Sequence, residues 1–314
     1  MAYNAGMQTR TLGRTAFNVS VLGFGAAPVA YLDTERQRAA QVLTYLLDAG
    51  VNVIDTAASY PGSEEFLGEF FSARRDDYVL VSKCGAGADE IDAPAWSARS
   101  ILHSVDRSLK RLRTDRIDVM LLHTCGLDTL KKGEALGALT NARQAGKIRF
   151  AGYSGDNDAA AWAAAHPDVA VIETSVNVVD QINVDKVLPL AREHNVGVIA
   201  KRPVANAAWK DLHQQPGMYQ SYAKEYTERL RKVKVTPRDL GFTASPDEAW
   251  PEVALRFTLS FPEVHTAIIG TTSLENARRN VEIAQKGPLP PEVVQKLRAA
   301  FRAADPTAAW LGQG

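Results

Sequence analysis

The stretch Val51–Glu65, VNVIDTAASYPGSEE, carries the pattern that decides the fold of this 314-residue chain. It begins with the apolar run Val51–Ile54, whose β-branched residues predict a buried strand. Asp55 follows the strand, Tyr60 lies in the next loop, and Ser63 is expected to cap the helix after it. Parallel α/β proteins carry their reactive groups at such strand ends. The stretch therefore predicts a carboxyl and a phenol at one mouth of a sheet or barrel, unless Asp55 only caps a turn and Tyr60 only packs.

The composition is that of an ordinary globular protein, because 46% of the residues are apolar and 23% are charged. Lysine plus arginine equals aspartate plus glutamate, 36 of each, so no pooled charge favours a nucleic acid or a membrane surface as a partner. No apolar run approaches the ~20 residues that a membrane-spanning helix needs, and the N-terminus does not have the pattern of a signal peptide. We expect a cytoplasmic protein, a monomer or small homo-oligomer, that acts on a small molecule.

Eight short apolar runs, each followed by a helical pattern, extend through the chain on both sides of this stretch. The alternation predicts an α/β fold, a single (β/α)8 TIM barrel over residues 1–314 with an N-terminal β-hairpin and a C-terminal loop and helix extension. A doubly wound open sheet is the main alternative, but its dinucleotide fingerprint would need a third glycine after Gly23 and Gly25. Helices are expected, among others, at Pro94–Leu112 and Leu130–Ala145. The predicted strands are Val21–Ala26, Val51–Ile54, Tyr78–Lys83, Ile117–Leu122, Ile148–Gly152, Val169–Glu173, Val196–Ala200 and His265–Ile269.

Four ionisable side chains stand at or just after the ends of three consecutive predicted strands: Asp55, Tyr60, Lys83 and His123. In a barrel these strand ends converge on one mouth. A lysine ammonium near a phenol lowers the pKa of that phenol from its usual value of about 10, and an aspartate can hold the lysine. A histidine beside the phenol can orient a carbonyl group by hydrogen bonding. The set predicts a site that gives a proton to a carbonyl oxygen while hydride reaches the carbon, although each residue alone could be solvated or packed.

A metal-dependent barrel hydrolase is a further alternative. Such an enzyme would need a His-x-His pair at a strand end, and the sequence contains none. The two cysteines also lack the spacing of a zinc site. No metal is therefore expected.

The motifs, taken in order along the chain, resemble those of the aldo-keto reductase family. The resemblance implies that Tyr60 is the general acid, that Lys83 and Asp55 tune it, and that His123 positions the carbonyl group. It also implies NAD(P)H bound without a Rossmann fold. The matching segments are Asp55-Thr56-Ala57 with Tyr60, Ser63-Glu64 and Leu67-Gly68, then Val79–Lys83, Ile117–His123, Gly146–Ser154, Asn177 and Gly270–Asn280.

The resemblance further implies a set of residues that bind the cofactor. Glu173 replaces the glutamine that such enzymes often place at the nicotinamide carboxamide, and Lys201 replaces a tyrosine that often stacks on the ring. NADP(H) is favoured over NAD(H), and Arg278 or Arg279 is left to supply a charge for the 2′-phosphate. The implied cofactor-binding residues are Gly25, Ser154, Glu173, Lys201, Arg202, Gly270, Thr271, Thr272, Ser273, Asn276, Arg279 and Asn280.

The interpretation that covers most of these residues is an NAD(P)H-dependent oxidoreductase that transfers hydride between nicotinamide and an aldehyde or ketone, or the reverse on an alcohol or sugar. Its alternative is a nicotinamide-binding regulatory or redox-sensing subunit with little turnover. Trp96 and Trp310 are expected in the substrate pocket, with Tyr222 among other aromatic candidates, unless they only pack. Cys84 and Cys125 lie within two residues of catalytic positions, either as packing residues or as thiols that oxidation can use to block the site.

Overall fold

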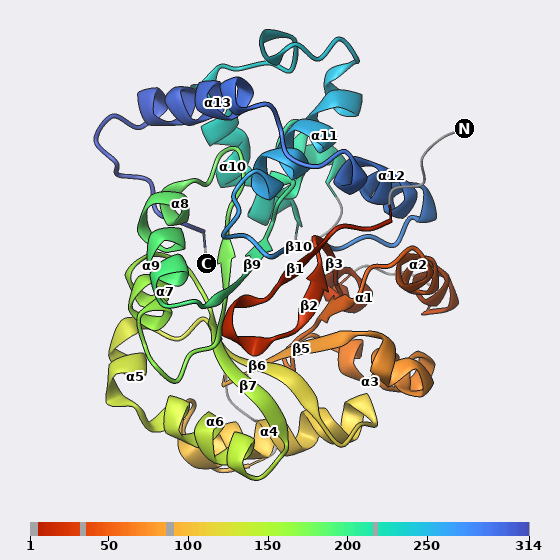
Figure 1. The fold of residues 1–314 in the computed structure, drawn as a ribbon, viewed down its shortest axis with the longest axis vertical. Coiled ribbons are helices and arrows are strands. Elements are labelled where there is room, and N and C mark those ends of the chain that lie inside the picture. Colours follow the sequence, from red (N-terminus) through yellow and green to blue (C-terminus); the bar gives the residue numbers. More distant parts are fainter. Residues whose placement is uncertain (1–5, 32–35, 86–90, 216–218, 314) are drawn as a thin grey trace.

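Eight parallel strands close into a barrel in the computed structural model, which describes residues 6–31, 36–85, 91–215 and 219–313. Each strand pairs with its neighbour in sequence, and β10 closes the ring on β3 (Figure 1). This confirms the predicted α/β fold, a (β/α)8 barrel. The barrel strands are β3 (Leu22–Gly25), β4 (Val53–Asp55), β5 (Val79–Cys84), β6 (Ile117–His123), β7 (Ile148–Ser154), β8 (Val171–Ser175), β9 (Gly197–Lys201) and β10 (Thr266–Ile269).

The predicted N-terminal hairpin covers the end of the barrel where the strands begin. β1 (Thr9–Thr11) pairs antiparallel with β2 (Asn18–Ser20). Between them, the Leu12 side chain is fully buried and packs with the residues inside the barrel. Arg10 donates hydrogen bonds to three main-chain carbonyls of the segment 259–264. The hairpin therefore closes this end by packing and by hydrogen bonding.

The strand sequences are apolar because both faces of each strand are buried, one inside the barrel and one under the helices. Successive side chains point to opposite faces of a strand. In β5, Val81 therefore packs in the barrel interior, whereas Leu80 packs in the shell between the strands and the helices. The interior cluster also contains Val53, Val119, Leu121, Val171, Ile199 and Ile268.

The helix after the Val51–Glu65 stretch begins as predicted but is capped differently. In α3 (Ser63–Phe70) the cap position belongs to Gly62, whose φ of 71° a glycine adopts without strain. The Ser63 hydroxyl instead hydrogen-bonds the Thr56 hydroxyl at 2.8 Å. The expectation that Ser63 caps this helix is therefore wrong, because its side chain is used to join the helix to the loop after β4.

Two other predicted helices have different boundaries in the structure. α4 (Ala98–Leu112) begins later than Pro94, because the Ser97 hydroxyl accepts the Ser100 N–H and starts the helix there. The predicted helix Leu130–Ala145 is two helices that meet at Gly133, which has a φ of 77°. The remaining helices are α1 (Ala27–Tyr31), α2 (Arg36–Asp48), α5 (Leu127–Lys132), α6 (Glu134–Gln144), α7 (Asn157–Ala164), α8 (Ile182–Lys186), α9 (Leu188–Glu193), α10 (Tyr219–Val233), α11 (Pro246–Leu259), α12 (Leu274–Gln285) and α13 (Pro291–Ala304).

A second apolar cluster packs beside the barrel, where α10 and α11, which precede β10, meet α13 of the C-terminal extension. α10, α11 and α13 contribute Tyr226, Phe257 and Phe301 to this cluster, and all three side chains are buried. The tail after α13 then returns toward β8 and β9 (Figure 1). There the Ser175 hydroxyl donates to the carbonyl of Gln313 at 3.0 Å. The end of the chain is thus attached to the side of the barrel mouth.

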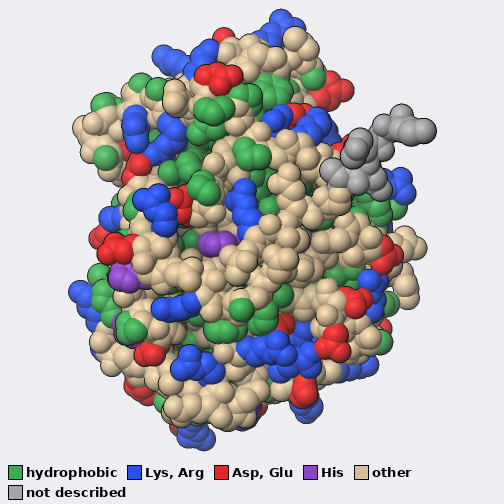
Figure 2. Space-filling view, viewed as in Figure 1, with side chains coloured by type: hydrophobic (Ala, Val, Ile, Leu, Met, Phe, Trp, Pro, Cys, Tyr) green, Lys and Arg blue, Asp and Glu red, His purple; other side chains and the backbone are tan. Residues whose placement is uncertain are grey.

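Charged side chains of both signs are interspersed on the face that Figure 2 shows. This distribution agrees with the equal numbers of basic and acidic residues in the sequence. Within the described residues, the helices are either too short or too polar to cross a membrane.

Candidate active site

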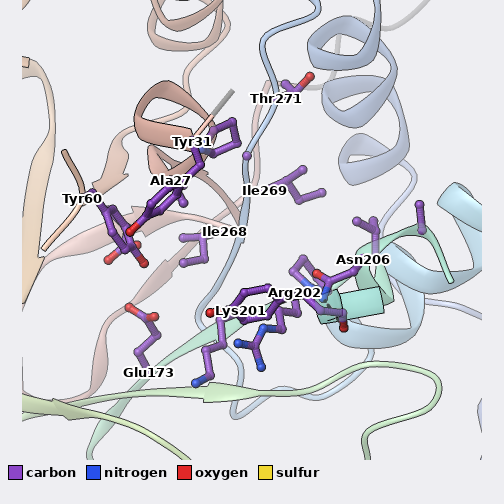
Figure 3. Close-up of a pocket in the computed structure, with 18 of the residues that line it drawn as sticks. Ala27, Tyr31, Tyr60, Glu173, Lys201, Arg202, Asn206, Ile268, Ile269 and Thr271 are labelled. Carbon is purple, nitrogen blue, oxygen red and sulfur yellow. Dashed lines mark hydrogen bonds between the residues drawn. The ribbon is translucent and has the colours of Figure 1, made fainter. Parts of the chain in front are cut away.

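A cavity of about 780 Å³ opens at the end of the barrel where the strands finish. Because all eight strands are parallel, their carboxyl ends meet here and supply much of its wall. The residues that Figure 3 labels surround this cavity: Tyr31 and Tyr60 on one side, Arg202 and Asn206 on another, Glu173 and Lys201 at one end, and Thr271 at the other. Glu173 and Lys201 therefore lie together at the end of the cavity away from Thr271.

The structure brings together the four ionisable side chains that the sequence singled out. Asp55 ends β4, Lys83 lies in β5 and His123 ends β6, so three neighbouring strands position them, while Tyr60 comes from the loop after β4. The Lys83 Nζ atom lies 5.3 Å from the centroid of the Tyr60 ring. The ring centroids of Tyr60 and His123 are 5.9 Å apart. Asp55, Tyr60 and His123 line the cavity, and Lys83 is buried behind them.

Lys83 lies between two carboxylates. Its ammonium donates to both oxygens of Asp55 at 2.6 Å and to the carbonyl of Thr56 at 3.1 Å. Glu173, from β8 across the barrel, has its Oε2 atom 3.2 Å from the same nitrogen. Burial works against the charge of Lys83, but Asp55 and Glu173 outweigh it and raise the pKa of the ammonium. Lys83 is therefore a permanent cation at neutral pH.

The electrostatic effect on Tyr60 differs from the sequence-based prediction. Burial raises the pKa of the Tyr60 phenol well above its usual value, Lys83 acts in the opposite direction, and Asp55 and Glu173 add to the increase. The predicted lowering by Lys83 is present, but burial and the two carboxyl groups outweigh it in the cofactor-free protein. The sequence-based prediction considered the ammonium but omitted the burial of the phenol and the second carboxylate. Tyr60 is a neutral phenol at neutral pH.

His123 is also neutral in this environment. Burial lowers the pKa of its imidazole to about 4, and the nearby Lys83 cation acts in the same direction. Its Nδ1 atom lies 3.2 Å from the Ser59 hydroxyl, with which it shares a hydrogen bond. A neutral imidazole in this position can hydrogen-bond a polar group in the cavity without adding charge to it.

Three of the implied cofactor-binding residues, Ser154, Glu173 and Lys201, share one end of the cavity. The Ser154 hydroxyl donates to Glu173 Oε1 at 3.3 Å. Lys201 does not point freely into the cavity, because its ammonium pairs with Asp156 Oδ2 at 2.9 Å. Burial works against the Asp156 carboxylate, but Lys201 and the N–H of Ser175 outweigh it and lower the pKa of this carboxyl. Lys201 and Asp156 therefore form a buried ion pair at this end of the cavity.

The opposite end of the cavity is formed by Gly25 and the loop that leads into α12. Gly270 packs so closely that an added Cβ would lie 2.5 Å from Pro28 Cγ. The Ser273 hydroxyl caps α12 by accepting the N–H of Asn276 at 3.3 Å. Arg279 and Asn280 are not among the lining residues. The other implied residues that line this end are Gly270, Thr271, Thr272, Ser273 and Asn276.

The basic residues considered for a 2′-phosphate lie in α12, which follows this loop, and outside the cavity lining. Arg279 donates a hydrogen bond to the carbonyl of Glu248 in α11. Arg278 is exposed, and its guanidinium carbon lies 5.7 Å from the centroid of the Tyr45 ring. Arg202 does line the cavity, over the ring of Tyr222 at 5.3 Å, and its guanidinium also donates to the Gln313 carbonyl of the tail.

The two tryptophans expected in the substrate pocket lie away from the cavity wall. Trp96 packs directly over Gly85, where an added Cβ would lie 1.9 Å from the indole ring. Trp310 packs edge-on against Phe301, with ring centroids 5.2 Å apart. Of the aromatic candidates named above, Tyr222 does line the cavity. The sequence did not indicate which of these rings face the barrel mouth, because loop residues carry no periodic pattern.

The two cysteines are packing residues in this structure. Cys84 and Cys125 are free thiols with 2% and 3% of their surface exposed. Burial raises the pKa of both thiols, to about 11 for Cys125. Because the thiolate is the form that oxidants attack, these environments make both cysteines poor targets for oxidation.

The sequence analysis missed several residues of the site, among them Tyr31, Asn206 and Asp156. Tyr31, from the short helix α1, lies with its ring centroid 5.7 Å from that of Tyr60. Asn206 lines the cavity from the loop after β9. Asp156 holds Lys201, and it could have been found by the rule that selected Asp55, because it follows the end of β7. Tyr31 and Asn206 had no such signal.

This geometry, a barrel with a lysine, an aspartate, a tyrosine and a histidine at its mouth, defines a class of oxidoreductases. A sequence profile of the Aldo/keto reductase family matches residues 21–302, and the chain belongs to that family. The chain is therefore an oxidoreductase of a family that uses nicotinamide cofactors.

The individual relatives are distant but cover nearly the whole chain. The solved structure of aldo-keto reductase AKR11C1 from Bacillus halodurans (holo form) superposes with a TM-score of 0.78 at 27% identity, over 95% of this chain and 97% of that one. The uncharacterized oxidoreductase YqkF of Bacillus subtilis is 29% identical, over 93% of this chain and 96% of the relative. L-galactose dehydrogenase of Arabidopsis thaliana is 27% identical, over 88% of this chain and 87% of the relative.

Proposed function

We propose that this chain reduces an aldehyde or ketone, or oxidises an alcohol or sugar, with Tyr60 as the proton donor in the reducing direction. The observation that carries the proposal is the meeting of Asp55, Tyr60, Lys83 and His123 at one cavity. One barrel over residues 1–314 performs the whole reaction in this proposal. The relative named L-galactose dehydrogenase supports including sugars among the substrates.

The cavity suits a nicotinamide dinucleotide. One end holds Glu173, whose buried Oε2 atom has no hydrogen-bond donor within the described part of the chain and can accept one from a carboxamide. Its other end reaches the N-terminus of α12, and helix N-termini favour phosphate groups. NADP(H) is favoured over NAD(H) in this proposal, because Arg278 and Arg279 follow that loop. The preference for NADP(H) is tested by comparing the dissociation constants of NADP(H) and NAD(H).

When bound, the reduced nicotinamide supplies a hydride to the carbonyl carbon. The Tyr60 hydroxyl gives its proton to the carbonyl oxygen, so the C=O group becomes CH–OH and Tyr60 becomes a phenolate. The Lys83 ammonium, held by Asp55, stabilises that phenolate until solvent returns the proton. The neutral His123 imidazole orients the carbonyl group by hydrogen bonding.

The test is a panel of aldehydes and ketones, followed by the loss of nicotinamide absorbance with NADH and NADPH in parallel. Tyr60→Phe is expected to lower turnover by about 10²–10⁴-fold, because it removes the proton donor. The dissociation constant of the cofactor should change little. Tyr31→Phe is the matched control, since this ring contacts Tyr60 and also lines the cavity, and it should cost less than tenfold. Full turnover in Tyr60→Phe would contradict the assignment, and tight cofactor binding without turnover on any carbonyl would favour the regulatory alternative.

A further inference from the structure

The Lys83 ammonium is surrounded by oxygen atoms, and the Tyr60 hydroxyl is not among its hydrogen-bond partners. An ammonium has three N–H donors. Three oxygens accept from Lys83: both carboxylate oxygens of Asp55 and the Thr56 carbonyl. Glu173 Oε2 lies close by at 3.2 Å. The three N–H donors of Lys83 are therefore engaged by these oxygens and not by the Tyr60 hydroxyl.

Glu173 is an unusual neighbour for this ammonium. It reaches the cluster from β8, three strands away from β5, and its side chain is buried with 3% exposed. Its Oε1 accepts from Ser154, whereas Oε2 is near enough to Lys83 for an ion pair but is not aligned to accept a hydrogen bond. Figure 3 shows the carboxylate directed toward the side of the cavity where Tyr60 lies. A glutamine here would keep the shape of the side chain but would not attract the ammonium as a charge.

We propose that Glu173 is a positioning residue of the reaction: with Asp55, its carboxylate retains the Lys83 ammonium and keeps the Tyr60 hydroxyl in its proton-carrying form. The inference rests on the proposed function in taking Tyr60 as the proton donor. It implies that the site is set for carbonyl reduction. Alcohol oxidation needs Tyr60 as a base, and the second carboxylate moves that step to higher pH.

The charges that face Tyr60 from each neighbouring element agree with this inference. They are Asp55 from β4, Lys83 from β5, neutral His123 from β6, Glu173 from β8, Lys201 from β9 and the phenol of Tyr31 from α1. Lys201 is paired with Asp156, so the cluster next to the phenol has two carboxyl groups and one ammonium. Burial and the neighbouring Glu173 raise the pKa of Asp55, whereas Lys83 and Lys201 outweigh burial at Glu173 and lower its pKa, so Glu173 is the carboxyl of the two that holds its negative charge more strongly. That charge opposes ionisation of the Tyr60 phenol.

The experiment titrates Tyr60 in the cofactor-free protein. The ultraviolet absorbance of phenolate is followed with pH in the wild type and in Glu173→Gln, each measured against the same protein with Tyr60→Phe, so the difference belongs to Tyr60 alone. The midpoint in Glu173→Gln is expected about one pH unit or more below that of the wild type, the usual effect of removing one charge at this range. Glu173→Asp keeps the charge but shortens the side chain, so it should shift the midpoint less and in the same direction.

Glu64→Gln is the matched control. Glu64 is also a buried glutamate, 1% exposed, but it accepts from Ser82 at 2.8 Å and lies near Arg111 instead of Lys83. It should leave the Tyr60 midpoint unchanged. Equal midpoints in the wild type and both Glu173 variants, or no Tyr60 signal in any of them up to the pH at which the fold is lost, would overturn the inference.

A second readout uses the working enzyme. In Glu173→Gln, the pH profile of kcat for alcohol oxidation should move to lower pH, whereas loss of a simple cofactor contact would raise the cofactor KM without moving the profile. If no carbonyl or alcohol is turned over, the proposed function fails, and the phenolate titration still decides whether Glu173 controls Tyr60.

Discussion

The two ends of the barrel are built from the same eight strands but differ in their packing, backbone conformation and buried charges. At the hairpin end, Leu12 fills the barrel and Arg10 satisfies three main-chain carbonyls. Left-handed residues other than glycine occur there singly at turns, as at Ala16 and Asn195. At the mouth, buried charges gather around Lys83, and three consecutive residues, Ala205–Ala207, are left-handed. The comparison indicates that packing and hydrogen bonds stabilise one end, whereas backbone strain and buried charged groups are tolerated at the other, where a ligand would bind.

The largest effect on stability is expected from Gly13 at the hairpin end. Its φ is 48°, and an added Cβ would lie 2.2 Å from the nitrogen of Gly197. Both the backbone conformation and the space therefore require glycine. Gly13→Ala should lower the free energy of unfolding by about 2–4 kcal/mol, measured by chemical denaturation. Turnover per folded molecule should be unchanged, because the site lies at the other end.

Gly126→Ala is the matched control at the mouth. Gly126 has a φ of −68°, and an added Cβ there would meet nothing within 4 Å. The free energy of unfolding of this variant should lie within about 0.5 kcal/mol of that of the wild type. If Gly13→Ala is as stable as Gly126→Ala, the hairpin end is not the rigid closure that the comparison supposes.

A smaller, pH-dependent effect is expected from His265, which precedes β10 at the hairpin end. Burial lowers the pKa of this imidazole to about 4, and the Arg10 cation acts in the same direction. The Nδ1 atom accepts the N–H of Val198 at 2.9 Å, so protonation would remove an acceptor. Because the unfolded chain takes up a proton near pH 6.5 and the folded chain only near pH 4, stability is lost as the pH falls through this window.

The variant His265→Asn tests whether His265 causes this loss of stability at low pH. The asparagine oxygen can still accept the N–H of Val198, but it does not titrate in this range. The loss of unfolding free energy between pH 7 and about pH 4.5 should be smaller than in the wild type. His123 also has a pKa of about 4, and burial raises the pKa of Asp180 to about 6, but both groups remain in the variant and cancel in the comparison. An identical pH dependence in both proteins would contradict the prediction.

The fold was predictable because strands that are buried on both faces appear in the sequence as short apolar runs. The ends of these runs also located Asp55, Lys83 and His123, since the carboxyl ends of parallel strands all lie at the same mouth of the barrel. Helix interruptions such as Gly133 were not predicted, because a glycine inside an apolar periodic pattern does not by itself show where the helix stops.

The electrostatics of the site could not be predicted in the same way. Lys83 and Glu173 belong to strands that are not neighbours, so their 3.2 Å contact depends on side chains that reach across the barrel interior. The raised pKa of Tyr60 follows from burial and from that contact, and neither is visible in a motif. Tyr31 lies beside Tyr60 only because of the path of the short helix α1. Sequence thus located the groups, but their charge balance required the packed structure.

The smallest expected effect concerns the left-handed turn at the mouth. Ala207 has a φ of 53°, which costs an L-residue roughly 1–2 kcal/mol, whereas glycine adopts it freely. Glycine also loses more entropy on folding, so Ala207→Gly should raise the free energy of unfolding by only about 0.5–1 kcal/mol. Ala208→Gly is the control: Ala208 has a φ of −57°, so glycine brings no relief there and should destabilise. Because Ala207 lines the cavity, equal destabilisation by both variants would mean that the turn is not strained, and the contrast between the two ends would then rest on the buried charges alone.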